Sequence, residues 1–217
     1  MIRVIVCDDQ EIVVQGLSTI LNNDPQIQVV ATASNGLEVM EQVATHHPDL
    51  VLMDLKMPGI NGIQATQKIK SSFPQIKVLV LTTYDDDEWL FDAIRAGASG
   101  YLLKDTPSVN LIQAIKGTLE GDTYLDPSVA GKVLNNVATQ NKTLASSNHV
   151  QLSDRETDVM QLMARGLTNA DIARELYLSE GTVRNYTSAI FTKLGVNDRT
   201  QAVIAALRYG LVNIHDV

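Results

Sequence analysis

Cysteine and long apolar runs are the features that this sequence has least of. Cys7 is the single cysteine among 217 residues and lies in the apolar run Ile5-Val6-Cys7. A disulfide framework is therefore excluded, and a buried thiol in a reducing compartment is expected. No apolar run approaches the roughly 20 residues that a membrane-spanning helix needs. The first residues also lack the pattern of a signal peptide, so we expect a soluble, cytoplasmic protein.

A strongly basic segment is also missing. The net charge is −8. Residues 1–145 contain 10 Lys and Arg against 17 Asp and Glu, which gives −7, and residues 146–217 contain 7 against 8, which gives −1. A broad positive field that attracts nucleic acid is therefore excluded, and any DNA binding has to depend on a local cluster of basic residues.

Short apolar runs alternate with amphipathic stretches over the first 120 residues. The five runs that we predict as strands are Ile2–Cys7, Ile27–Ala33, Leu50–Met53, Val78–Leu81 and Ser99–Leu103. The stretches between them repeat apolar residues at helical spacing, as at Leu111, Ile112, Ile115 and Leu119. This alternation predicts an α/β domain with a parallel sheet, of the flavodoxin-like, doubly wound (βα)5 type.

The pattern changes after residue 120. Residues 121–149 are interpreted as a linker, with a helix predicted over Pro127–Val137. Residues 150–217 show helical signals alone, and we predict helices over 154–165, 169–176, 180–194 and 198–208. Capping boxes are expected at Ser153–Glu156 and Thr168–Asp171. The sequence thus predicts a small all-α domain behind the α/β domain.

Charged and polar residues follow four of the predicted strands. Asp8 and Asp9 follow the first strand, Asp54 the third, Thr82 the fourth and Lys104 the fifth. If the strands have the usual order 2-1-3-4-5, the three carboxylates converge at one sheet edge. Two such charges about 4 Å apart repel by about 4 kcal/mol at an effective dielectric of 20, so the site needs a proton or a cation.

Hard oxygen ligands in a small site favour Mg²⁺. Beside such an ion, Asp54 is placed to attack phosphorus and form an aspartyl phosphate, while Lys104 and the Thr82 hydroxyl stabilise phosphoryl oxygens. The simpler alternative is that each aspartate only caps a helix or shapes a turn, since Asp is common after strands. Four matching strand ends favour the phosphoryl site.

These residues resemble the receiver domain of two-component response regulators over residues 2–119. The matching pieces are Asp8-Asp9, Asp54-Leu55-Lys56-Met57-Pro58-Gly59, Thr82 and Gly100-Tyr101-Leu102-Leu103-Lys104. The resemblance implies that Asp9, Asp54 and the carbonyl of Lys56 hold Mg²⁺, with Asp8 helping through water. It further implies phosphorylation by a sensor histidine kinase, a shift of Thr82 and an inward turn of the switch aromatic Tyr101. Asp105 stands where many receivers have proline.

The two helices predicted over 169–194 form a helix-turn-helix pattern. Arg184, Asn185, Ser188 and Thr192 share the outer face of the second helix, where Arg can bind guanine and Asn adenine. An ordinary helical hairpin with a polar face is the alternative. Residues 152–207 resemble the DNA-binding domain of the NarL/LuxR class, with matches that include Thr182-Val183-Arg184 and Lys193-Leu194. The resemblance places base contacts on the second helix and dimer contacts on the last.

The leading hypothesis is therefore a phosphorylation-controlled transcription regulator that binds double-stranded DNA as a homodimer. The DNA contacts are expected at Thr182, Arg184, Asn185, Ser188 and Lys193. Two other classes are compatible with these residues: an enzyme that uses the Asp54 pocket on external substrates, and a protein-interaction adaptor with a degenerate helix-turn-helix. The sequence shows no sign of the substrate cleft that an enzyme needs, whereas its weak basic charge favours the adaptor.

Overall fold

The computed structural model describes residues 1–83, 87–122, 124, 150–196, 198–209 and 211–212. These residues form two compact units. Residues 1–120 with Tyr124 make up the first unit, and Gly121, Asp122 and the described residues from Val150 onward make up the second. Among the described residues, no helix is both long and apolar enough to cross a bilayer. The helix predicted over Pro127–Val137 lies outside the described residues.

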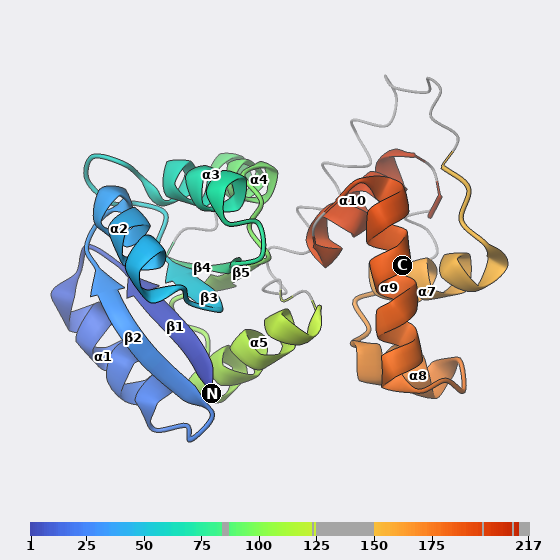
Figure 1. Cartoon of the computed structure of the whole chain (residues 1–217), viewed down its shortest axis with the longest axis horizontal. Coiled ribbons are helices and arrows are strands. Elements are labelled where there is room, and N and C mark those ends of the chain that lie inside the picture. The colour runs from blue at the N-terminus through green and yellow to red at the C-terminus, as the bar shows by residue number, and fades with distance from the viewer. Residues whose placement is uncertain (84–86, 123, 125–149, 197, 210, 213–217) are drawn as a thin grey trace. The chain divides into compact units, whose positions relative to one another are not determined.

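A five-stranded parallel sheet forms the centre of the first unit (Figure 1). Its strands are β1 (Ile2–Cys7), β2 (Ile27–Ala33), β3 (Leu50–Met53), β4 (Lys77–Thr82) and β5 (Gly100–Leu103). Their order is β2-β1-β3-β4-β5, and every neighbouring pair is parallel. Each strand lies within one residue of its predicted limits. Four of the strands coincide with apolar runs that the sheet largely buries on both faces, whereas the edge strand β2 is partly exposed.

Helices cover both faces of this sheet (Figure 1). They are α1 (Glu11–Asn22), α2 (Gly36–His46), α3 (Gly62–Ser72), α4 (Asp87–Arg95) and α5 (Ser108–Glu120). Residues of α1 and α5 such as Leu21 and Ile115 pack with one set of strand side chains, while Val43 of α2 and Ile69 of α3 pack with the other. Successive strand residues point to opposite faces, which divides the core into these two layers.

The winding of the chain brings the carboxyl ends of β1 and β3 together. Cys7 pairs with Met53 at the last position of the two strands, so the residues that follow them start from adjacent points. The Asp54 amide donates to the Cys7 carbonyl at 2.8 Å and extends this pairing by one residue. Because the chain turns away in opposite directions from β1 and β3, a shallow crevice is expected at this edge, where parallel α/β folds place their sites.

The second unit consists of helices alone among its described residues. They are α7 (Asp154–Ala164), α8 (Asn169–Glu175), α9 (Glu180–Leu194) and α10 (Arg199–Arg208). Both predicted capping boxes are present: the Ser153 side chain accepts from the Glu156 amide, and the Thr168 side chain accepts from the Asp171 amide. Gly195 ends α9 in the left-handed conformation with φ of 68°, as a C-terminal glycine typically does.

The helices of this unit pack around the longest one, α9 (Figure 1). Val183 and Ile190 of α9 are fully buried, as are Ile172 of α8 and Met160 of α7. The short turn Tyr177-Leu178-Ser179 joins α8 to α9, so the helix-turn-helix predicted from the sequence is present. The predicted fold class, an α/β sheet domain followed by a small all-α domain, is confirmed.

Candidate functional sites

Three carboxylates meet at the carboxyl edge of the sheet. Asp8 and Asp9 follow β1, and Asp54 follows β3. One oxygen from each of them lies within 4.8 Å of the other two, a spacing that could hold a metal ion. Asp8 and Asp54 are buried, with 3% and 4% of their surface exposed, whereas Asp9 is exposed. A site with two buried acids and one open acid lets an ion enter from solvent.

Asp8 has two partners that satisfy its two oxygens. Its Oδ1 accepts a hydrogen bond from the Gln10 amide at 3.0 Å, just before α1 begins. Its Oδ2 lies 2.6 Å from the Lys104 ammonium nitrogen, which comes from the end of β5. The turn-shaping role that the sequence allowed for Asp8 therefore coexists with its place in the charged cluster, and its side chain does not cap α1.

Asp54 is held less completely than Asp8. Its Oδ2 lies 3.4 Å from Lys104 Nζ, while its Oδ1 is buried without a hydrogen-bond partner among the described residues. Burial raises the pKa of the Asp54 carboxyl, the Lys104 charge lowers it, and the Asp8 charge raises it. This carboxylate is costly to ionise and has one unsatisfied buried oxygen. Both features suit a site where a bound cation stabilises the charge and contacts that oxygen.

Three further predicted residues lie on β4, on β5 and in the loop after β3. Thr82 ends β4, is fully buried, and is close enough to Asp54 to lower the pKa of that carboxyl through a hydrogen bond. Tyr101 on β5 is also fully buried, so its ring occupies an inward position. Lys56 is exposed in the loop after Asp54. The buried Thr82 hydroxyl therefore faces the Asp54 carboxyl.

Glycine at position 62 allows the loop after β3 to close. A Cβ atom there would lie 2.0 Å from the Asp54 carbonyl oxygen and 2.8 Å from Leu55 Cα. The Gly62 amide also donates to the Leu55 carbonyl at 2.9 Å, so the first turn of α3 packs directly against the backbone that carries Asp54. Any side chain at this position would push the acidic residue out of place.

The outer face of α9 carries the residues predicted to bind DNA. Arg184, Asn185 and Ser188 are exposed, and Thr182 is half-buried. The Thr182 hydroxyl lies 2.8 Å from Ser179 Oγ, which also accepts from the Thr182 amide and caps the helix. This face therefore presents one guanidinium, one amide and two hydroxyl groups, which suit the edges of bases in a major groove.

Arg184 pairs with an acidic residue on its own helix. Its guanidinium lies 3.5 Å from Glu180 Oε2, one turn earlier on α9, and both side chains are about half exposed (49% and 51%). The spacing of four residues on a predicted helix is the signal that could have identified this pair. An exposed pair of this kind stabilises little and is easily exchanged for another partner.

Lys193, the remaining predicted DNA contact, is held by α7. Its Nζ donates to Glu156 Oε2 at 2.6 Å and to the Gln151 carbonyl at 3.4 Å, while 41% of its side chain stays exposed. Glu156 is buried and accepts from the Ser153 amide with the same oxygen. The hydrogen bond from Lys193 is the main cause that lowers the pKa of the Glu156 carboxyl. This pair fixes the end of α9 against the start of α7.

Two families of protein match this chain, one for each unit. Residues 4–116 match the response regulator receiver domain, and residues 150–206 match the bacterial regulatory proteins of the luxR family. The first match alone covers more than half of the 217 residues. The chain belongs to the response regulators of the NarL/LuxR class. The family predicted from the sequence is therefore confirmed.

Relatives of this regulator share its whole length. The transcriptional regulatory protein LnrK of Bacillus subtilis is 41% identical over 97% of this chain and 99% of its own length. The oxygen regulatory protein NreC of Staphylococcus epidermidis is 39% identical with the same coverage. The regulator is therefore a transcriptional regulator of this class and not a classical enzyme.

Solved structures of response regulators have the same fold. The response regulator ChrA of a heme-sensing two-component system is 38% identical and matches 97% of this chain and 98% of that one, with a TM-score of 0.53. A structure of two RcsB dimers bound to two parallel DNAs is 25% identical and covers 96% of both chains, with a TM-score of 0.57. The two-domain architecture thus recurs in a protein that binds DNA as a dimer.

Proposed function

We propose that Asp54 accepts a phosphoryl group from a sensor histidine kinase and that this modification controls DNA binding by the second unit. The observation that carries the proposal is the convergence of Asp8, Asp9 and Asp54 within 4.8 Å at the sheet edge, beside Lys104. Three acids around one lysine leave an excess of negative charge that a divalent ion would balance.

Mg²⁺ is the cation that suits this donor set best, because all the protein ligands are hard oxygens. Asp9, Asp54 and the Lys56 carbonyl would hold it, with Asp8 helping through a water molecule. The unsatisfied Oδ1 of Asp54 supports this assignment, since a buried carboxylate oxygen needs a partner. When bound, the ion neutralises negative charge on the incoming phosphoryl group and on the acids around it.

The residues of the chain then perform the transfer. A carboxylate oxygen of Asp54 forms a bond to phosphorus, while the bond from phosphorus to the donor atom breaks and that atom keeps the electron pair. Lys104 already lies 3.4 Å from Asp54 Oδ2, where its charge would stabilise a phosphoryl oxygen. The Thr82 hydroxyl would supply a further hydrogen bond, and with the switch residue Tyr101 it would transmit the change to the surface.

The DNA contacts are proposed on the exposed face of α9. Arg184 and Asn185 would read base edges, and Thr182, Ser188 and Lys193 would contact bases or phosphates nearby. Arg184 exchanges its weak pairing with Glu180 for a base when it binds. The last helix, α10, would pair two copies of the regulator, so that each dimer covers two half-sites about one helical turn of DNA apart.

The proposed domain limits follow from the same division. Residues 1–120 would form the receiver, 121–149 the linker, and 150–217 the DNA-binding domain. The family matches over 4–116 and 150–206 support these limits. A regulator that meets both its kinase and its operator would act in the cytoplasm.

Phosphorylation is tested by incubating the full chain with acetyl phosphate and Mg²⁺ and measuring the intact mass. We expect the mass of one phosphoryl group to be added to the wild type and not to the Asp54→Asn variant. The Asp49→Asn variant is the matched control, because Asp49 is an aspartate outside the pocket that accepts from the Arg3 amide. Modification of the Asp54→Asn variant, or none of the wild type, would contradict the proposed site.

DNA binding is tested by selection from fragmented genomic DNA with the phosphorylated chain. Enrichment of a sequence with two related half-sites is expected. The Arg184→Ala variant should lose about 1–3 kcal/mol of discrimination at one base position in each half-site. Failure to enrich any sequence would favour an adaptor that works through protein partners.

A further inference from the structure

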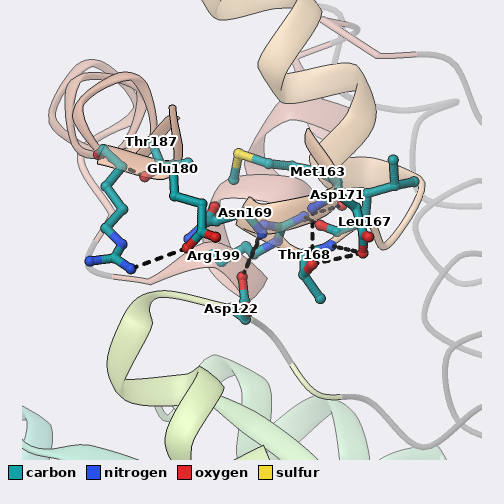
Figure 2. Close-up of polar contacts among 10 residues, drawn as sticks. Asp122, Met163, Leu167, Thr168, Asn169, Asp171, Glu180, Thr187 and Arg199 are labelled. Carbon is teal, nitrogen blue, oxygen red and sulfur yellow. Dashed lines mark hydrogen bonds and ion pairs between the residues drawn. The ribbon is translucent and has the colours of Figure 1, made fainter. Parts of the chain in front are cut away.

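A polar network outside the two sites surrounds Arg199, the first residue of α10 (Figure 2). Only 3% of its side chain is exposed. Its guanidinium donates to the Met163 carbonyl at 3.2 Å and also to the Leu167 carbonyl, so it binds the backbone where α7 ends and the turn towards α8 begins. One side chain of α10 thereby fixes the end of α7.

Asp122 lies opposite this arginine within the second unit. Its Oδ1 is 3.8 Å from the Arg199 guanidinium, and it accepts a hydrogen bond from the Asn169 amide at 3.0 Å (Figure 2). Asn169 is the first residue of α8, and its amide is one of those that a helix leaves without an internal partner. A single carboxylate thus caps α8 and faces a buried cation.

The environment of Asp122 is that of a structural contact. Its side chain is 11% exposed, and burial raises its pKa, against the lowering effects of the Asn169 hydrogen bond and the Arg199 charge. The nearby charges of Asp171 and Glu180 act in the same direction as burial. In such surroundings the carboxylate is stabilised by the two groups that it binds. Loss of Asp122 would leave Arg199 buried without this opposite charge.

We propose that Asp122 is a positioning residue for the helix-turn-helix, which it completes from a place 47 residues ahead of Asn169 in the chain. By capping α8 and balancing the charge of Arg199, it holds α8 and the end of α7 against the start of α10. This packing fixes the position from which α9 contacts DNA. The inference rests on the proposed DNA contacts of α9. It also means that a DNA-binding fragment that begins at residue 150 lacks part of its own scaffold.

The test compares the full chain with its Asp122→Asn and Asp122→Ala variants. Asn keeps an acceptor for the Asn169 amide and removes the charge opposite Arg199, whereas Ala removes both. The Asp158→Asn variant is the control, because Asp158 forms an exposed pair with Arg155 at 3.4 Å in the same unit. Hydrogen exchange of the Asn169–Asp171 amides reports on the cap, and affinity is measured for the duplex selected above at several salt concentrations, well below the unfolding temperature.

We expect faster exchange at the start of α8 in the Ala variant, with a smaller effect in the Asn variant and none in the control. The affinity of the Ala variant should fall about three- to tenfold, in line with the loss of a helix cap. The salt dependence should stay unchanged, because no phosphate contact is removed. Unchanged exchange in the Ala variant, or tighter DNA binding by it, would overturn the inference. A wild type that binds no duplex would instead contradict the proposed function, and the exchange result would still stand.

Discussion

The ammonium nitrogen of Lys104 lies 3.4 Å from Asp54 Oδ2, close enough to lower the pKa of that carboxyl. Lys104 also lies 2.6 Å from Asp8. One lysine therefore contacts two of the three acids, and its single charge offsets only part of theirs. In the proposed function this lysine competes with Mg²⁺ for the acids. It then stabilises a phosphoryl oxygen when Asp54 is phosphorylated.

Competition between these two cations leads to the first prediction. The Lys104→Met variant should bind Mg²⁺ about tenfold more tightly than the wild type, because a nearby positive charge is removed from the site. The same variant should be phosphorylated more slowly, since a phosphoryl-stabilising group is lost. Isothermal titration with Mg²⁺ and the rate of modification by acetyl phosphate measure the two effects. Equal Mg²⁺ affinity in both proteins would show that Lys104 does not compete with the ion.

The second prediction concerns the cost of ionised Asp54. Burial and the Asp8 charge raise the pKa of this carboxyl, so its charged form destabilises the fold at neutral pH. The Asp54→Asn variant keeps the shape and removes the charge, and its unfolding temperature without Mg²⁺ should rise by several degrees. Thermal unfolding followed by circular dichroism checks this. A lower unfolding temperature would indicate that the ionised carboxylate is well satisfied.

Mg²⁺ should stabilise the wild type in the same experiment. At ten times its dissociation constant the ion adds about 1.4 kcal/mol to the free energy of unfolding, provided that it binds the folded state alone. We expect a rise in the unfolding temperature of the wild type and a much smaller one for Asp9→Asn, which removes the exposed ligand. A metal response that Asp9→Asn leaves intact would place the ion elsewhere.

The fourth prediction concerns the Glu156–Lys193 pair. Replacing Glu156 with Gln should lower the free energy of unfolding of the second unit by about 1 kcal/mol at neutral pH, because the part-buried hydrogen bond from Lys193 loses its ionised acceptor and keeps only a neutral amide oxygen. Folding lowers the pKa of Glu156 from its ordinary 4.5, so its stabilisation is present above that pH and is lost as the pH falls through the folded value. The difference between wild type and variant should therefore shrink in acid. A pH-independent difference would rule out the ion pair as its source.

The fifth prediction concerns Lys193. Its ammonium group donates to Glu156, but 41% of its side chain is exposed and can also approach DNA. If its ammonium group also reaches a phosphate, the Lys193→Met variant should reduce the slope of log affinity against log salt by about 1. Glu156→Gln should leave this slope unchanged, although both variants lose the same pair. A slope that Lys193→Met does not alter would restrict this lysine to holding α9 against α7.

The sequence predicted those features that depend on local signals or on strand ends. The capping boxes at Ser153 and Thr168 are local, and each was found where expected. The cluster of Asp8, Asp9 and Asp54 could be predicted because parallel strands carry their carboxyl ends to one edge. Once the strand order was assumed, the adjacent pair Asp8-Asp9 and the distant Asp54 were expected to meet.

Contacts between residues on different helices follow no regular spacing in the sequence, so they could not be predicted in this way. Glu156 was expected to cap α7, and nothing in the sequence indicated that it also binds Lys193, 37 residues further on. Asp122 lies in the stretch interpreted as a linker, yet it caps α8 within the second unit. Both pairings depend on how the helices pack, and the packing of helices leaves no spacing rule in the residues that meet.

The account as a whole depends on a link between Asp54 and DNA affinity. Footprinting of the selected duplex with untreated protein, with protein treated with acetyl phosphate and Mg²⁺, and with treated Asp54→Asn tests that link most directly. We predict that treatment tightens binding of the wild type about tenfold, a common size for coupling between two sites, and leaves Asp54→Asn at the untreated level. Equal protection by all three proteins would contradict the account, because DNA binding would then be independent of the Asp54 site.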